Sequence, residues 1–331
     1  MILAALDRPR REVAEIDYAL LWSALLLLVT GLVMVYSSSI ATAEAARATG
    51  YQPAFYLLRH SVFLVIGLVA AGIAFQFPLS VWQRYAPILF MVGAVLLAIV
   101  LIPGIGKDVN GARRWLPLGP INLQPSELMK LFAVLYAADY TVRKINVMHD
   151  LKQAFLPMAG AMAVVGMLLL KEPDFGAFVV IISIAMGILF LGGLKARLFV
   201  LLILFLLAAF ALLILVSPYR RDRIFGFMDP WADAFGRGYQ LSHSLIAFGR
   251  GELFGVGLGA SVEKLFYLPE AHTDFLLAVI AEELGFVGVL TVVALFAIVV
   301  QRAFAIGRQS VQLDRLYPAL VAMGIGIWIG V

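Results

Sequence analysis

The stretch YALLWSALLLLVTGLVMVYSSS at residues 18–39 decides the fold class of this chain. It contains no Asp, Glu, Lys or Arg. Because a helix of about 20 apolar residues crosses the ~30 Å hydrocarbon core of a bilayer, the stretch predicts a membrane-spanning helix. Arg8, Arg10 and Arg11 precede it, as in a signal peptide. The run reaches spanning length without a small-residue cleavage site, however, which favours a first membrane anchor.

The rest of the chain repeats this pattern. Of its 331 residues, 63% are hydrophobic and 14% are charged, against about 25% charged in a typical soluble protein. The predicted spans are residues 18–39, 54–75, 84–102, 125–142, 153–170, 175–192, 196–216, 272–300 and 317–331. We therefore predict an all-α polytopic membrane protein of about nine spans, folded as a single integral membrane domain over residues 1–331. The absence of cysteine excludes disulfides and thiolate metal ligands.

Basic residues in the loops set the predicted orientation, because cytoplasmic loops of membrane proteins are enriched in Lys and Arg. With a cytoplasmic N-terminal segment at residues 1–17, the short inner segments carry twelve basic residues and the short outer loops carry six. The interval at 217–271 then becomes a long extracytoplasmic loop between spans 7 and 8, and it carries six more basic residues. Either the outer face handles an anionic ligand, or these residues contact solvent and lipid headgroups.

The long outer loop ends in LFYLPEAHTDF at residues 265–275, which places His272 and Asp274 at the mouth of the eighth span. A carboxylate there is costly unless it has a partner or a function. Residues 240–248 have apolar positions at helical spacing and predict a short amphipathic helix. The glycine-rich run at 249–259 is incompatible with a regular helix, and it predicts either a re-entrant turn or a backbone that approaches a ligand.

A second polar cluster lies before and at the start of the fourth span. Arg113 and Arg114 stand beside Trp115 between turn residues. Guanidinium groups grip phosphate oxygens in a fork, so an anionic ligand with a sugar or apolar face is predicted here. Glu127 and Lys130 are three residues apart and share one helix face. They form either an internal ion pair or a polar wall of a cavity open to the outer face.

Two further charged groups belong to the same region. Glu172 and Asp174 lie in a very short turn between the fifth and sixth spans, where Asp174 suits a helix cap. Glu282 and Glu283 lie about two turns into the eighth span, deep enough to mark a functional site or to pair with a basic neighbour. All of these clusters project toward the outer face, so the sequence predicts one polar site there.

Six motifs of the chain form a recognisable set. They are GARRW at 111–115, QPSE at 124–127 with Lys130, EPDFG at 172–176, GYQL at 238–241, KLFYLPEAHTDF at 264–275 and AEELG at 281–285. Together they resemble the SEDS family (shape, elongation, division and sporulation), the bacterial peptidoglycan glycosyltransferases, and the resemblance extends from the first span to the end of the chain. The segment KLFYLPEAHTD at 264–274 is more similar to the cell-division branch (FtsW) than to the elongation branch (RodA).

The resemblance implies a SEDS-type bundle of ten helices in the bacterial cytoplasmic (inner) membrane. This chain supplies about nine of them, so the C-terminal part of the family's bundle is expected to be missing. The implied activity is polymerisation of lipid II into β-1,4 glycan strands at the outer face of the membrane, during septal cell-wall synthesis in cell division. The two alternatives are a lipid II flippase or transporter and an elongation-type polymerase.

The resemblance also implies site residues and partners. Asp274 is the implied catalytic carboxylate, and the implied substrate-binding residues are Arg113, Arg114, Glu127, Lys130, Asp174, Lys264 and His272. The implied partners are lipid II (an undecaprenyl-pyrophosphate-linked disaccharide pentapeptide), membrane lipids, a class B penicillin-binding protein (an FtsI-type transpeptidase) and an activator complex of the FtsQ, FtsL, FtsB and FtsN type. No organic cofactor and no nucleic acid are expected.

The chemistry of the residues agrees with this reaction. Glycosyl transfer from a lipid pyrophosphate needs a base for the acceptor hydroxyl, cationic groups for the leaving pyrophosphate and an apolar surface for the lipid. Asp274 can supply the base. Arg113, Arg114 and Lys130, or a divalent cation such as Mg²⁺ or Mn²⁺, can supply the positive charge, and the metal requirement stays open. A transporter would need access from both faces, whereas the charges here gather at one.

Overall fold

The structure is a computed structural model that describes residues 16–109, 111–119, 121–148, 150–216 and 226–331. The predicted N-terminal segment at 1–17 and the predicted outer loop at 217–271 therefore lie partly outside the described residues. The helices are α1 (Tyr18–Ala45), α2 (Phe55–Gln76), α3 (Leu79–Val100), α4 (Pro125–Lys144), α5 (Leu156–Lys171), α6 (Phe175–Leu191), α7 (Ala196–Val216), α9 (Tyr239–Gly251), α10 (Leu276–Gln312) and α11 (Leu316–Gly330). The short 3-10 and π turns are Arg47–Thr49, Ile145–Val147, Leu151–Phe155 and Pro230–Asp233.

The helices match the predicted apolar runs and identify a multi-pass membrane protein. Among the described residues, five helical segments are long and apolar enough to cross a bilayer: α1, α2, α3, α10 and the continuous segment Leu151–Lys171 that contains α5. Two more, α6 and α11, are apolar but shorter. The predicted span at 125–142 corresponds to α4. This helix contains five charged residues, namely Glu127, Lys130, Asp139, Arg143 and Lys144.

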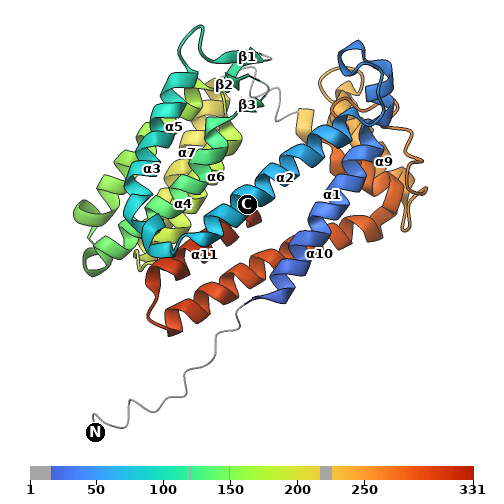
Figure 1. Cartoon of the computed structure of the whole chain (residues 1–331). Helices are drawn as coiled ribbons and strands as arrows, with labels where there is room; N and C mark the ends of the chain where they lie inside the picture. Colours follow the sequence, from blue (N-terminus) through green and yellow to red (C-terminus); the bar gives the residue numbers. More distant parts are fainter. Residues whose placement is uncertain (1–15, 110, 120, 149, 217–225) are drawn as a thin grey trace.

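Two packing groups make up the bundle (Figure 1). In the larger group, α4 packs against α3 and α6, and its buried face supplies Met129, Ala133 and Val134 to the main core. In the second group, α10 packs against α1 and α9. The two groups are joined by α11, which contacts α10, α4 and α6. Of the charged side chains of α4, Asp139 is buried and pairs with Arg143 at 2.8 Å, whereas Glu127 and Arg143 are exposed near the two ends of the helix.

A small antiparallel sheet corrects the all-α prediction. Strands β1 (Lys107–Val109), β2 (Ala112–Leu118) and β3 (Ile121–Leu123) pair in the order β1-β2-β3. Both turns have two residues, because Val109 pairs with Ala112 and Leu118 pairs with Ile121. Such turns need positive φ, and Gly111 (φ 77°) and Gly119 (φ 72°) provide it. Figure 1 shows the sheet at the same end of the bundle as the segment around α9.

The glycine-rich run has a structural explanation. The predicted amphipathic helix is confirmed as α9, but it extends through Gly251, further than expected. The following residues pack backbone against backbone on α10, which is broken at Gly285 (φ 68°, ψ −168°). The amide of Phe286 donates to the carbonyl of Glu252 at 2.9 Å, and the amide of Val256 donates to the carbonyl of Glu282 at 2.9 Å. A re-entrant turn therefore replaces the helical hydrogen bonds that the break removes.

Candidate functional site

Asp274 lies in the turn that leads into α10. The predicted eighth span began at residue 272, but α10 begins at Leu276, so Asp274 precedes the helix. The amide of Phe275 donates to the carbonyl of Glu270 at 3.2 Å and closes this turn. Asp274 is exposed, and its carboxylate has no hydrogen-bond or ion-pair partner among the described residues. Its carboxylate is therefore accessible to a ligand.

His272 lies beside Asp274 in the sequence and packs against α2. Its ring centroid is 4.5 Å from that of Tyr56. Burial lowers the pKa of His272 below its ordinary value of 6.5, and the neighbouring Glu270 carboxylate partly offsets this effect. His272 is therefore neutral at physiological pH, so it can accept or donate a hydrogen bond but supplies no positive charge.

Arg113 and Arg114 are neighbours on β2 but have different surroundings. Arg114 donates from its Nε to the backbone carbonyl of Glu172 at 3.1 Å, and from its terminal nitrogen to the carbonyl of Pro173. Arg113 reaches Asp108 on β1 at 3.7 Å, a long and exposed contact. Only one of the two predicted phosphate ligands is thus uncommitted: Arg113 is available to an anion, whereas Arg114 ties the sheet to the turn between α5 and α6.

Asp174 caps α6, as the capping interpretation predicted. Its carboxylate accepts from the amide of Ala177 at 3.2 Å. It also accepts from the hydroxyl of Ser126 at 2.9 Å and from the side-chain amide of Gln124 at 3.2 Å. Asp174 is buried. These bonds join the start of α4 to the start of α6, so Asp174 supports the wall of the site rather than facing a ligand.

Glu172 is a buried residue whose importance the sequence did not reveal. It is fully buried, and neither carboxylate oxygen has a hydrogen-bond partner among the described residues. Burial, together with the neighbouring charge of Asp174, raises the pKa of Glu172 to about 8, although the Arg114 guanidinium opposes both effects. The side chain is thus protonated and neutral at pH 7. In the sequence, the spacing of Glu172 and Asp174, two residues apart in one turn, was the available indication of a shifted pKa.

Glu127 and Lys130 form the predicted ion pair at the start of α4. Their charged atoms are 2.7 Å apart. The Glu127 side chain is 54% exposed and that of Lys130 is 14% exposed, so the pair borders solvent and is not a deeply buried bridge. The Lys130 ammonium also lies 5.6 Å from the ring centroid of Trp328 on α11. This geometry agrees with a polar wall more than with an ion pair between helices.

Lys264, like Asp174, is bound to protein groups in this structure. It is buried, and its ammonium contacts the Glu283 carboxylate of α10 at 2.5 Å. It also donates to the carbonyl of Gly259 at 2.8 Å and to the hydroxyl of Ser37 at 3.0 Å. With three protein partners and almost no exposed surface, Lys264 holds elements together in this structure.

The predicted residues thus divide into two clusters at the same end of the bundle. One contains the sheet, the start of α4 and the turn before α6; the other contains the start of α10 and the loop before it. Within the described part of the chain, no hydrogen bond or ion pair links the two clusters, and no group of three or more His, Asp or Glu side chains is arranged to hold a metal ion.

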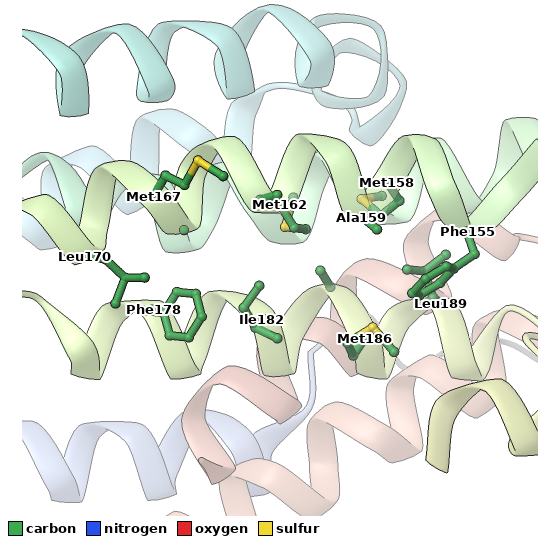
Figure 2. Close-up of a pocket in the computed structure, with 13 residues that line it drawn as sticks. Phe155, Met158, Ala159, Met162, Met167, Leu170, Phe178, Ile182, Met186 and Leu189 are labelled. Atoms are coloured by element: carbon green, nitrogen blue, oxygen red, sulfur yellow. The ribbon is translucent and has the colours of Figure 1, made fainter. Parts of the chain in front are cut away.

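An apolar cavity lies between α5 and α6. Its volume is about 510 Å³. Figure 2 shows side chains of both helices projecting into it, among them Met162 and Met167 from α5 and Ile182 and Met186 from α6. Unbranched Met side chains adapt to irregular apolar partners. At one end the cavity is lined by Leu170 and Phe178, which flank the turn that carries Glu172 and Asp174.

Two known proteins have similar sequences over almost the whole of this chain. A protein from Aromatoleum aromaticum is 67% identical over 326 residues, which cover 98% of this chain and 80% of that protein. A protein from Burkholderia thailandensis is 57% identical over 326 residues, which cover 98% of this chain and 71% of that protein. Both relatives are described as "Probable peptidoglycan glycosyltransferase FtsW".

Solved structures and a family model lead to the same group. A chain described under "Structural coordination of polymerization and crosslinking by a peptidoglycan synthase complex" superposes with a TM-score of 0.73 at 27% identity, covering 96% of this chain and 85% of that chain. The Thermus thermophilus rod shape determining protein RodA superposes with a TM-score of 0.64 at 27% identity, covering 96% of this chain and 83% of that chain. The model of the FtsW/RodA/SpoVE family, described as "Cell cycle protein", matches residues 18–331. This chain belongs to that family.

Proposed function

We propose that this protein is a peptidoglycan glycosyltransferase of the cell-division type, which polymerises lipid II into β-1,4 glycan strands. The observation that carries the proposal is the unpartnered, exposed carboxylate of Asp274 at the entrance of α10. The high identity to proteins described as FtsW, against 27% to RodA, favours septal synthesis over elongation.

Asp274 is the proposed general base, because its carboxylate is exposed and has no partner among the described residues. In this role it takes the proton of an acceptor sugar hydroxyl. The hydroxyl oxygen then attacks the anomeric carbon of the donor sugar, and the bond from that carbon to the pyrophosphate breaks. In-line attack on an α-linked donor inverts this carbon and produces a β-linked strand. The neutral imidazole of His272 can orient the same hydroxyl by hydrogen bonding.

The departing pyrophosphate needs positive charge. Arg113 and Lys130 are the candidates, because each is bound to a carboxylate that solvent reaches rather than locked to backbone carbonyls. Arg114 and Lys264 act indirectly in this proposal, since Arg114 binds two backbone carbonyls and the Lys264 ammonium binds three protein groups. A requirement for Mg²⁺ or Mn²⁺ stays a prediction, and the loss of polymer on addition of a chelator would support it.

The apolar cavity between α5 and α6 suits the lipid part of the donor. Its lining consists of apolar side chains, and its Leu170 end adjoins the turn at Glu172 and Asp174. An isoprenoid chain in this cavity would keep the pyrophosphate near the outer end of the bundle. Replacement of Ala163, an exposed residue of the cavity lining, by Leu should obstruct the cavity and raise the KM for lipid II, with a smaller effect on a water-soluble short-chain analogue.

The proposed setting is the cytoplasmic (inner) membrane at the division septum, with a cytoplasmic N-terminus and an extracytoplasmic site. The proposed partner is a class B penicillin-binding protein of the FtsI type, activated with proteins of the FtsQ, FtsL, FtsB and FtsN type. Support comes from the 0.73 TM-score to a chain of a peptidoglycan synthase complex.

The deciding experiment uses the protein in detergent, purified with its transpeptidase partner and supplied with labelled lipid II. The parent should form polymer that a muramidase degrades. Asp274→Asn should reduce the rate by about 10² to 10⁴, the usual cost of removing a general base. Asp314→Asn, at an exposed aspartate after α10, is the matched control and should polymerise normally. A parent that forms no polymer but moves lipid II across liposome bilayers would be a flippase instead.

A further inference from the structure

Glu282 and Glu283 are consecutive carboxylates inside α10, one turn or less before its break at Gly285. Both have 0% exposed surface, so neither can touch a substrate. Removing an ionised carboxylate from water costs several kcal/mol unless it is paired and hydrogen-bonded. The partners of these two side chains therefore indicate what they do.

Glu282 binds the turn at residues 261–263. Its carboxylate accepts from the hydroxyl of Ser261 at 2.5 Å, from the amide of Val262 at 3.0 Å and from the amide of Glu263 at 3.3 Å. Arg250, at the end of α9, balances the charge at 3.2 Å. One side chain thus fixes three consecutive residues of the outer loop.

Glu283 binds the next residue of the same turn. Its carboxylate contacts the Lys264 ammonium at 2.5 Å and accepts from the Ser37 hydroxyl of α1 at 2.8 Å. Together the two glutamates hold residues 261–264 onto the outer half of α10. The loop that follows leaves this anchor at Lys264 and returns to α10 at Leu276, so it is closed at both ends by the same helix.

The closed loop contains Asp274 and is strained. Phe266 (φ 70°) and Glu270 (φ 55°) adopt positive φ, which is unfavourable at a non-glycine residue. Such conformations persist only where the surroundings determine them. Two apolar side chains, Leu268 and Ala271, are buried in this loop, but the polar contacts at its start come from Glu282 and Glu283.

We propose that Glu282 and Glu283 are positioning residues for Asp274: through the turn at 261–264 they hold the 265–275 loop in the conformation that presents the Asp274 carboxylate. The assignment of a reaction to Asp274 rests on the proposed function, whereas the mechanical link between the glutamates and the loop does not. The experiment therefore measures the two separately.

The link is measured by the mobility of a spin label. The chain has no cysteine, so Thr273→Cys gives a single attachment site beside Asp274. In the parent the label should have an ordered spectrum. Glu282→Ala should add a mobile component, and Glu282→Gln, which keeps one acceptor oxygen, should add less. The matched control is Arg302→Met, which breaks an ion pair of α10 with Asp17 at the other end of the helix and should leave the spectrum unchanged.

Two single variants and the corresponding double variant distinguish loss of loop order from misfolding of the whole protein. Each single variant, Lys264→Met or Glu283→Met, leaves one buried charge without its partner. The double variant removes both charges and replaces the ion pair by an apolar contact, a substitution that proteins with buried ion pairs often tolerate. Each single variant should increase label mobility and lower kcat for polymerisation about 10- to 100-fold, with the KM for lipid II changed less than about threefold. The double variant should recover most of the order and at least part of the rate.

Two outcomes would overturn the proposal. One is an unchanged spectrum at residue 273 in all the Glu282, Glu283 and Lys264 variants. The other is a mobile label with an unchanged kcat per folded molecule, because positioning would then be irrelevant to the reaction. Absence of polymerisation by the parent would contradict the proposed function, and the spectra would still decide whether the glutamates order the loop.

Discussion

Arg114 binds the backbone carbonyl of Glu172 at 3.1 Å, while the carboxylate of the same glutamate has no hydrogen-bond partner among the described residues. An arginine near a buried carboxylate would usually pair with it. Here the Arg114 guanidinium instead stabilises the backbone conformation of the turn, and burial keeps the Glu172 side chain neutral. The turn between α5 and α6 therefore depends on a protonated side chain.

The first prediction follows from the pKa of Glu172, which is about 8 in the folded protein and 4.5 in an ordinary environment. Between these values the folded state holds a proton that the unfolded state has lost. The contribution to stability is complete below about pH 4.5 and is lost as the pH rises through 8, with a slope of up to about 1.4 kcal/mol per pH unit. Thermal unfolding in detergent, followed by tryptophan fluorescence from pH 5 to 8.5, measures this loss.

The variant Glu172→Gln tests this pH dependence of the stability. Glutamine has the shape of the protonated side chain but cannot ionise, so the melting temperature of this variant should vary less with pH and exceed that of the parent at pH 8. Asp108→Asn removes an exposed carboxylate of β1 and should leave the slope unchanged. Parallel curves for the parent and Glu172→Gln would show that Glu172 ionises normally.

The second prediction separates the two neighbouring arginines. Arg114→Lys loses the paired donors to two carbonyls, and one lost hydrogen bond costs about 1 kcal/mol, so this variant should melt several degrees lower. Arg113→Lys should melt like the parent, because its contact with Asp108 is long and exposed. Steady-state polymerisation is the complementary measurement: Arg113→Lys should lower kcat/KM about three- to tenfold if the fork binds pyrophosphate. If Arg113→Lys melted lower and Arg114→Lys lowered kcat/KM instead, Arg113 would be the structural arginine and Arg114 the pyrophosphate ligand.

The third prediction concerns two glycines of α9. A Cβ atom at Gly251 would lie 1.8 Å from the backbone carbonyl oxygen of Ala281, whereas a Cβ atom at Gly249 would meet nothing within 4 Å. Gly251→Ala should therefore separate α9 from α10 and reduce both the melting temperature and the yield of folded protein. Gly249→Ala should be neutral or stabilising by up to about 1 kcal/mol, because alanine favours a helix. Equal melting temperatures would contradict the close packing of the two helices.

The helices were predictable from the sequence because a membrane span is specified by its own composition. The runs beginning at Tyr18, Phe55 and Phe175 are apolar over most of their length, so local sequence was sufficient. The sheet was missed although two turn signals were present, Asn110-Gly111 and Gly119-Pro120. Asparagine-glycine is a strong hairpin signal, and it outweighs the expectation that a loop of a helical membrane protein lacks strands.

The sequence predicted a set of candidate site residues, but it did not predict their contacts. Sequence patterns grouped Arg113 with Arg114 and placed Lys264 among the ligands. Which arginine is free depends on the carbonyls of a turn almost sixty residues away, and the burial of Lys264 depends on a carboxylate in α10. Such contacts between distant segments leave no local periodicity, so only the folded structure assigns them.

The last prediction concerns the Glu127–Lys130 pair, which borders solvent on one side and Trp328 on the other. An ion pair whose acid is more than half exposed contributes at most about 1 kcal/mol, so Glu127→Gln should change the melting temperature little. Lys130→Met loses the ion pair and the contact with the Trp328 ring, so it should melt lower than Glu127→Gln. If the pair forms a wall of the substrate cavity, both variants should polymerise lipid II more slowly despite their different stabilities. Melting curves and initial rates on the same preparations compare the two effects. A rate that falls only in proportion to the folded fraction would make the pair structural and leave Arg113 as the remaining candidate cation for the pyrophosphate.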